Sequence, residues 1–326
     1  MLPDGPILDW SMTILGLFIL ILAGDALVKG AVNLSLRLGV PALIVSLTIV
    51  AFGTSAPELL ISIKAILDGV AGIALGNVVG SNTANILLVL GVPALIATMH
   101  TSTCETRRSY LQMIFASVLF IALCFFAPIT WWHGLILLAG LSIMLGSAFR
   151  AARAHRRDVA NEVPDEEDEE VEGADPSMPG WRIAIYLVLG LAGLPLGAEL
   201  LIDGSINIAR TFGLSEEVIG LTLVAIGTSL PELATTVMAA IRRQADVALG
   251  NVIGSNMFNL LAIIGVASLV GPIPVDPKFL SFDLWVMLSA SLLLIPFVFL
   301  RRDITRLWGA ALTALYAAYL VIVLAS

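Results

Sequence analysis

Long runs of apolar residues dominate this chain, and most of them match the length of a helix that crosses the bilayer core. None of these runs alternates between apolar and polar positions, which is the pattern of a membrane β-barrel strand. The pattern therefore predicts an all-α membrane protein with ten transmembrane helices. The predicted spans are residues 8–28, 40–66, 73–97, 110–127, 131–149, 182–209, 214–241, 246–270, 280–300 and 306–324.

Composition supports a membrane protein and argues against a soluble one. The chain is 58% hydrophobic and 13% charged, about half the charged fraction of a typical soluble domain. The lipid bilayer is therefore an expected partner, whereas nucleic acid is not. The two cysteines, Cys104 and Cys124, have no spacing that indicates a metal site, and a disulfide between them is not expected.

The one long polar stretch, residues 150–181, separates two apolar halves. It contains DEEDEEVEGAD at 165–175, which holds eight of the 25 acidic residues and accounts for most of the net charge of −8. Its composition is typical of a solvated linker between residues 1–149 and residues 182–326. A Ca²⁺-responsive regulatory segment is the alternative, although the stretch lacks the ligand spacing and turn glycine of an EF-hand loop.

The basic residues predict the orientation of the chain, because cytoplasmic loops carry an excess of Lys and Arg. With ten spans and an outside N-terminus, 14 of the 17 basic residues fall on the inner side and three on the outer side. We therefore expect a multi-pass protein of the plasma or inner membrane, with both termini outside and residues 150–181 in the cytoplasm.

An internal repeat sets the architecture. Residues 45–91 align without gaps on residues 219–265, an offset of 174, and 23 of the 47 positions are identical. Each half has five predicted spans, an odd number, so the second copy enters the membrane from the opposite side. The sequence thus predicts two inverted five-helix repeats, 1–149 and 182–326, a plan that recurs in transporters and places the substrate near the midplane.

Two matched hexapeptides, GTSAPE at 53–58 and GTSLPE at 227–232, place an acid and a proline inside predicted spans. Pro57 and Pro231 each remove a backbone hydrogen bond, so we expect a helix break at each. Glu58 and Glu232 are costly inside a bilayer and are therefore candidates for function. A structural pair of protonated or salt-bridged acids is the alternative. The neighbouring hydroxyls are those of Thr54, Ser55, Thr228 and Ser229.

The next span in each half carries a polar stripe at helical spacing. GNVVGSNTAN at 76–85 and GNVIGSNMFN at 250–259 each place Asn, Ser and Asn four residues apart. Polar contacts between helices are the alternative interpretation for any one asparagine. For the paired glycines of each segment, Gly76 with Gly80 and Gly250 with Gly254, close packing of helices is the favoured interpretation. The stripe residues are Asn77, Ser81, Asn85, Asn251, Ser255 and Asn259.

These side chains offer carboxylate, amide and hydroxyl oxygens, with no thiolate or imidazole inside the spans. Such a set suits hard cations such as Ca²⁺, Na⁺ or Mg²⁺ and disfavours Zn²⁺ and Cu⁺. Two glutamates neutralise one divalent ion, and Ca²⁺ accepts the flexible geometry that a broken helix provides better than Mg²⁺ does. No cofactor is expected, since the bound cation would be a transported ion.

The paired GTSxPE and GNVxGSNxxN segments resemble the two α-repeats of the cation/Ca²⁺ exchanger superfamily, near its prokaryotic Na⁺/Ca²⁺ exchanger branch. The resemblance covers both repeats and implies an antiporter that exchanges Ca²⁺ for Na⁺ by alternating access, in which residues 8–28 and 182–209 slide against the other helices. It also implies an ion site with carboxylates from Glu58 and Glu232, carbonyls from Thr54, Thr228, Ala51 and Ala225, hydroxyls from Ser55, Ser229, Ser81 and Ser255, and amides from Asn85 and Asn259.

Other functions remain open at this point. Some members of the superfamily have Asp where this chain has Asn259, so two carboxylates here argue against K⁺ dependence. An H⁺/Ca²⁺ or other divalent-cation antiporter is the main alternative, because Glu58 and Glu232 can bind protons. An enzyme is disfavoured, since no HExxH motif or asymmetric nucleophile–base pair is present. A passive cation channel is a further alternative, and the oligomeric state stays open.

Overall fold

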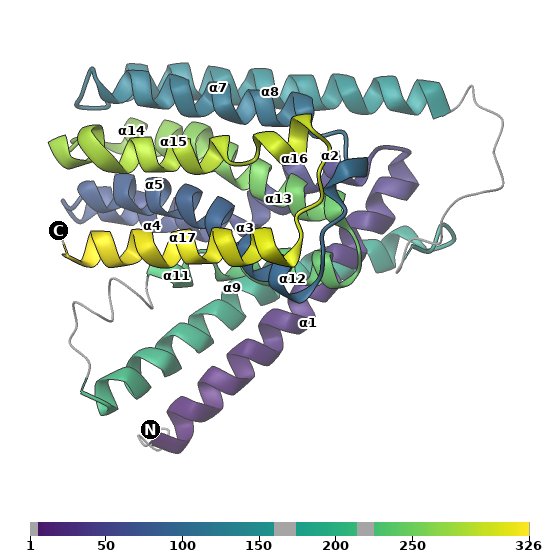
Figure 1. Cartoon of the computed structure of the whole chain (residues 1–326), viewed down its shortest axis with the longest axis horizontal. Helices are drawn as coiled ribbons and strands as arrows, with labels where there is room; N and C mark the ends of the chain where they lie inside the picture. Colours follow the sequence, from purple (N-terminus) through teal and green to yellow (C-terminus); the bar gives the residue numbers. More distant parts are fainter. Residues whose placement is uncertain (1–5, 160–173, 214–224, 326) are drawn as a thin grey trace.

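The computed structural model describes residues 6–159, 174–213 and 225–325, and these ranges are built of helices (Figure 1). The first half contains α1 (Pro6–Leu38), α2 (Ala42–Val45), the π-helical turn η1 (Ser46–Val50), α3 (Ala51–Thr54), α4 (Ala56–Leu67), α5 (Gly72–Leu87), α6 (Gly91–Ile96), η2 (Thr101–Thr103), α7 (Arg107–Cys124) and α8 (Trp131–Val159).

The second half contains α9 (Gly180–Thr211), α11 (Ala225–Gly227), α12 (Leu230–Ile241), α13 (Ala245–Met257), the π-helical segment η4 (Phe258–Ile263), α14 (Ile264–Val270), the π-helical turn η5 (Phe279–Asp283), α15 (Leu284–Leu292), α16 (Ile295–Phe299) and α17 (Arg306–Ala325). The described linker residue Asp175 donates its backbone N–H to Oδ1 of Asn33 on α1, at 2.8 Å. Most of the predicted acidic segment, 165–173, lies outside the described residues.

Within the described ranges, eight helices are long and apolar enough to cross a membrane. A ninth crossing results when Ala42–Thr54 and Ala56–Leu67, which meet at a bend of 40°, are taken as one span. The all-helical class of the predicted fold is confirmed. The predicted seventh span, 214–241, lies only partly in the described residues, where α12 forms its second part.

Two helices continue beyond the bounds that hydrophobicity predicts. α1 reaches Leu38 rather than residue 28, because Ala31 and Val32 remain buried against the bundle. It is followed by Gly39, whose φ of +63° is typical of the residue after a helix C-terminus. α8 runs through Val159 rather than ending at residue 149, since the Ala- and Arg-rich stretch that follows favours helix. The first ten residues of the predicted linker are therefore helical.

The bundle has two parts that differ in direction. Figure 1 shows α7 and α8 as one layer, with α14, α15, α4, α5 and α17 roughly parallel beneath it. α1 and α9 pack along each other and cross this bundle obliquely, in contact with α12. Gly16 and Gly197 bring the α1 and α9 backbones together, because an added Cβ at Gly16 would lie 2.7 Å from the Gly197 carbonyl oxygen. α1 and α9 therefore form one tightly packed pair.

Polarity is distributed opposite to that of a soluble protein. Large apolar side chains such as Leu60, Phe115 and Ile143 are more than 60% exposed, as lipid-facing residues are. Polar side chains from both repeats are buried at the centre, where α3 and α12 meet α13 and where α4 and α11 meet α5. The buried set includes Thr54, Ser55, Glu58, Ser81, Asn82, Asn85, Ser229, Glu232, Asn251, Ser255, Asn256 and Asn259.

The predicted close packing of paired glycines is confirmed for the second copy. A Cβ added at Gly250 would lie 2.8 Å from the Leu43 carbonyl oxygen, and one at Gly254 would lie 2.5 Å from that of Leu47. α13 therefore rests directly on the backbone of α2 and η1. The first copy, Gly76 and Gly80, makes no such approach to the described residues; the segment at the matching position, 217–221, lies outside them.

Replacing Gly254 with alanine should lower the free energy of unfolding by about 1–3 kcal/mol, because the added methyl group forces η1 away from α13. Gly146→Ala on α8 is the matched control, since no atom lies within 4 Å of its added Cβ and alanine favours helix. Thermal unfolding of both variants in detergent measures the difference. A Gly254→Ala protein as stable as the wild type would contradict this packing.

Candidate ion-binding site

Two helix breaks position the glutamates. α3 ends at Thr54 and α4 begins at Ala56, while α11 ends at Gly227 and α12 begins at Leu230, so the breaks predicted from Pro57 and Pro231 are confirmed. Each glutamate lies in the first turn after its break, where the positive end of the helix dipole favours a negative charge. The GTSxPE sequence therefore builds the same local structure in both halves.

Both glutamate side chains are fully buried and lie within electrostatic reach of each other. Oε1 of Glu232 accepts hydrogen bonds from Ser55 at 3.3 Å and from Ser255 at 3.5 Å. Neither carboxyl oxygen of Glu58 accepts a hydrogen bond from the described residues, and Oε2 of Glu232 also lacks a donor. Two buried carboxylates that repel each other in a medium of low dielectric constant need a cation or a proton to balance their charge.

Four asparagines link α5 to α13 and η4, which belong to different halves of the chain. Asn82 and Asn256 each donate their amide N–H to the other's backbone carbonyl, at 3.1 and 3.3 Å. The amide oxygen of Asn82 accepts from Asn259, and that of Asn256 accepts from Asn85, both at 3.0 Å. The four side chains therefore form a nearly symmetric network that fixes which way the amides of Asn85 and Asn259 point.

This network leaves the amide oxygens of Asn85 and Asn259 free. Both Oδ1 atoms are buried and accept no hydrogen bond from the described residues. With Oε1 and Oε2 of Glu58 and Oε2 of Glu232, they make five buried oxygens without a donor. Buried acceptors are normally satisfied, and a set made of carboxylate and amide oxygens alone is suited to a hard cation.

Hydroxyl groups connect the two repeats around these oxygens. Thr54 lies 3.4 Å from Ser255 and donates to the amide oxygen of Asn251 at 3.3 Å, between α3 and α13. Ser81 and Ser229 lie 3.4 Å apart, between α5 and the start of α12. Each half thus contributes hydroxyls that contact polar groups of the other half.

The remaining predicted residues lie at the two helix breaks. Thr228 is half-buried between α11 and α12, and Ala225 is the first residue of α11. The carbonyl oxygen of Ala51 already accepts from the backbone N–H of Ser55 at 3.1 Å, and the hydroxyl oxygen of Thr54 lies 3.3 Å from it. Direct contribution of these backbone carbonyls to ion binding therefore stays a prediction.

Sequence reasoning did not single out Asn82 and Asn256. Both are 1% exposed, and both hold the amides of other predicted ligands. A signal was present, because the two residues stand at the same repeat offset of 174 and are identical. Spacing alone could not separate them from other polar residues, since they lie off the stripe formed by Ser81 and Asn85.

α9 covers both helix breaks. A Cβ added at Gly53 would overlap Cδ2 of Leu191, and one added at Gly227 would overlap Cδ1 of Ile202. The aliphatic side chains of one helix therefore close over the start of GTSAPE and of GTSLPE. If α9 moved along the bundle, Leu191 and Ile202 would shift together relative to the two helix breaks that they cover.

Comparison with known proteins identifies relatives over almost the whole chain. The profile of the sodium/calcium exchanger protein family matches residues 8–148 and 182–325. Sodium/calcium exchanger MaX1 from Methanosarcina acetivorans is 34% identical over 348 residues, covering 96% of this chain and 98% of MaX1. Inner membrane protein YrbG from Escherichia coli is 33% identical over 288 residues, covering 88% of this chain and 87% of YrbG.

Solved structures of the sodium-calcium exchanger NCX_Mj have the same fold. The structure obtained by soaking with 2.5 mM Na⁺ and 10 mM Sr²⁺ aligns with a TM-score of 0.81 at 31% sequence identity. The alignment covers 97% of this chain and 99% of that one. The likeness therefore extends over both halves and over the buried polar centre between them.

Proposed function

This chain belongs to the sodium/calcium exchanger protein family, and from that premise we propose that it exchanges Ca²⁺ for Na⁺ across a membrane by alternating access. The family makes it a cation/Ca²⁺ antiporter and a multi-pass membrane protein. Na⁺ as the coupling ion is the finer part of the proposal. We also propose two inverted five-helix repeats, 1–149 and 182–326, with both termini outside and the linker cytoplasmic.

One observation carries the proposal: the five buried oxygens of Glu58, Glu232, Asn85 and Asn259 have no hydrogen-bond donor among the described residues. The oxygens come from matched positions in both repeats, so neither half forms the site alone. Two carboxylates balance one Ca²⁺, and carboxylate and amide oxygens are among its usual ligands. Na⁺ ions would use the same carboxylates and the hydroxyls beside them.

Because Ca²⁺ and Na⁺ would share the same two carboxylates, the protein would exchange one ion for the other and would not let either ion leak across the membrane. When neither ion is bound, Glu58 and Glu232 repel each other in a buried site, and this empty state is costly. Ca²⁺ and Na⁺ each remove that cost but compete for the same oxygens. The carrier therefore changes conformation most readily when it is loaded, which couples the two ion gradients.

The packed pair α1 and α9 is the proposed moving element. Its two helices are held together by close backbone contact and by a hydrogen bond from Asn207 to Asp9 at 3.0 Å. Asp25 on α1 forms an ion pair with Arg242 at the end of α12, which ties the pair to the helix of Glu232. Sliding of the pair would break this ion pair and move Leu191 and Ile202 away from the helix breaks.

An H⁺/Ca²⁺ antiporter is the second candidate. The absence of hydrogen-bond donors around Glu58 among the described residues favours it, because a proton would satisfy this buried carboxylate as a Na⁺ ion would. Other divalent cations of similar size belong to the same candidate. The two candidates share the site and differ only in the ion that replaces Ca²⁺.

Uptake of ⁴⁵Ca²⁺ into proteoliposomes under separately imposed Na⁺, K⁺ and H⁺ gradients tests the coupling ion. We expect an outward Na⁺ gradient to drive uptake, an outward K⁺ gradient to drive none, and an H⁺ gradient to drive none once the membrane potential is clamped. Protein-free liposomes are the control for leak. Uptake driven only by H⁺ would refute Na⁺ coupling and support the second candidate.

A further inference from the structure

Asn77 and Asn251 stand at matched positions in the two polar stripes, yet neither is among the candidate ion ligands. Each lies one helical turn before a serine of the site, in the part of α5 or α13 that follows the α4–α5 or the α12–α13 turn. The amide of Asn251 donates to the hydroxyl of Thr236 at 3.2 Å and to the backbone carbonyl of Glu232 at 3.4 Å. These bonds join α13 to α12 between the glutamate and the turn.

The matching atoms of the first half have no partner among the described residues. Ser62, the counterpart of Thr236, is fully buried, and its hydroxyl makes no hydrogen bond there. The amide nitrogen of Asn77 is likewise buried and donates to none of these residues. α4 and α5 nonetheless lie side by side, as α12 and α13 do. A hydrogen bond that ties two helices together in the second half is thus missing at the same place in the first.

The difference between the halves extends to the glutamates. Oε1 of Glu232 accepts from two serine hydroxyls, whereas both carboxyl oxygens of Glu58 lack a donor among the described residues. The sequence does not account for this, because these residues are identical in the two repeats except for Ser62 and Thr236, which both carry a hydroxyl. The two halves therefore hold nearly the same residues in two different arrangements, so each half is able to adopt either one.

The unpaired atoms identify the place where two helices part most easily. A buried hydroxyl or amide without a partner is destabilising, and water relieves this cost when the helices separate. α4 and α5 can therefore open between Glu58 and the α4–α5 turn, whereas the bond to Thr236 holds α12 and α13 together. In Figure 1, α4 and α5 extend towards the end of the bundle where the C-terminus lies, and α12 and α13 lie towards the other end. The untied and the tied positions thus lie towards opposite ends.

We propose that Ser62 with Asn77 and Thr236 with Asn251 form two alternative latches, only one of which is closed at a time, and that the closed latch decides to which face of the membrane the ion site opens. This inference rests on the proposed function, because it assigns the four residues to alternating access. The Thr236–Asn251 latch is closed in the structure, and the predicted orientation places it on the inner side, so this arrangement opens outwards. When the halves exchange arrangements, Ser62 pairs with Asn77 and Thr236 loses its bond.

Thr236→Val and Ser62→Ala each remove one hydroxyl and should shift the balance between the two arrangements in opposite directions. Loss of one hydrogen bond changes such an equilibrium by roughly three- to tenfold. The KM for Ca²⁺ at each face varies inversely with the fraction of protein that is open to that face. The ratio of the outer KM to the inner KM should therefore rise by that factor in Thr236→Val and fall by it in Ser62→Ala.

Right-side-out and inside-out membrane vesicles present the outer and the inner face, and ⁴⁵Ca²⁺ uptake into each of them gives the two KM values. The double variant S62A/T236V lacks both latches, so its KM ratio should lie within about twofold of the wild-type ratio. General damage to the ion site would add up in the double variant and would not cancel.

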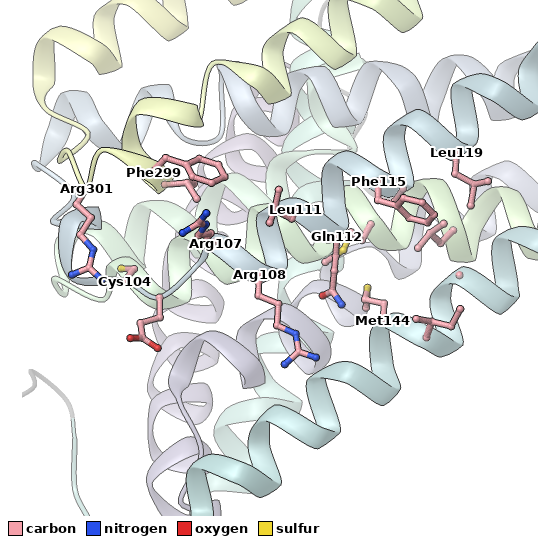
Figure 2. A pocket seen from close by; sticks show the side chains of 17 residues that line it. Cys104, Arg107, Arg108, Leu111, Gln112, Phe115, Leu119, Met144, Phe299 and Arg301 are labelled. Carbon is pink, nitrogen blue, oxygen red and sulfur yellow. The ribbon is translucent and has the colours of Figure 1, made fainter. Parts of the chain in front are cut away.

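Gln112→Ala is the matched control for the loss of a hydrogen bond between two helices. Gln112 lines a cavity between α7 and α8, outside both latches, and its amide donates to the hydroxyl of Ser147 at 2.6 Å (Figure 2). The KM ratio of this variant should equal that of the wild type.

Amide hydrogen exchange of the full chain tests the latches without transport. Each turn, residues 68–71 after α4 and residues 242–244 after α12, is compared with itself between variants, so differences in local sequence cancel. Thr236→Val should speed amide hydrogen exchange in the α12–α13 turn and slow it in the α4–α5 turn, because a turn whose helices are not tied opens more often. Ser62→Ala should have the opposite effect on both turns.

Three results would overturn the proposal. These are no shift of the KM ratio or of amide hydrogen exchange in either single variant, a shift in the same direction in both, or a double variant that departs further from the wild type than either single variant does. If the wild type transports no Ca²⁺ at all, the proposed function fails, whereas amide hydrogen exchange still decides whether the two pairs act as alternative latches.

Discussion

Replacing Glu232 with glutamine is expected to abolish Ca²⁺ exchange while the protein stays folded. The change removes one of two carboxylates from the site and leaves the size of the side chain unchanged. A charge pair about 4 Å apart at an effective dielectric constant of about 20 is worth about 4 kcal/mol, which is roughly a thousandfold in affinity. Glu58→Gln should have an effect of the same size, because Glu58 stands at the matching repeat position.

The fold should tolerate these substitutions. Glutamine removes the repulsion between two buried carboxylates, so the unfolding temperature without ions should not fall. The stabilisation that Ca²⁺ gives the wild type should be lost in both variants. The measurements are thermal unfolding with and without Ca²⁺ and Na⁺-driven ⁴⁵Ca²⁺ uptake.

Asp68→Asn is the matched control, since it neutralises an exposed acid just beyond the end of α4, the helix that carries Glu58. It should retain full uptake. Retained Na⁺-gradient-driven uptake by Glu232→Gln would refute the assignment of this carboxylate to ion binding.

Replacing Asn82 with alanine is expected to weaken Ca²⁺ binding about 10- to 100-fold, as loss of a group that orients a metal ligand does. Asn82 touches no free oxygen itself, but its Oδ1 accepts from the amide of Asn259 at 3.0 Å. Without that acceptor the Asn259 amide can rotate and turn its NH₂ group towards the cation. Asn256→Ala should act in the same way on Asn85.

Dependence of the uptake rate on Ca²⁺ concentration separates this role from a loss of folded protein. We expect a higher KM for Ca²⁺ with a monodisperse protein of similar yield. Gln112→Ala is the matched control, because it removes a side-chain amide hydrogen bond to Ser147 between α7 and α8, outside the ion site and the moving pair, and its KM should be unchanged. An unaltered KM in both Asn82→Ala and Asn256→Ala would contradict the orienting role.

Much of the helical framework could be predicted from hydrophobicity. The apolar runs predict the long helices, and Pro57 and Pro231 predict the breaks, because a proline cannot complete the backbone ladder in any context. Helix ends were less predictable. α1 continues past its apolar run because its later residues still pack against the bundle. α8 continues past its apolar run because the residues that follow have a high helix propensity.

The candidate site was predictable in its residue types but not in its connections. Repeat symmetry selected Glu58, Glu232, Asn85 and Asn259, since matched polar residues inside apolar spans are rare. It gave no sign that Asn82 and Asn256 hold the asparagine amides. Those hydrogen bonds join residues 171 to 177 positions apart, a separation at which local pattern carries no information.

The sequence by itself determined that this is a duplicated membrane protein with a carboxylate and a helix break in each copy, because composition, period and proline act locally. Only the tertiary structure decided which oxygens remain free for a cation. The groups that donate hydrogen bonds around the site lie mostly on segments of the other half, which come into contact only when the two halves pack. A buried oxygen is available to an ion only when no neighbour in space, near or far in the chain, donates to it.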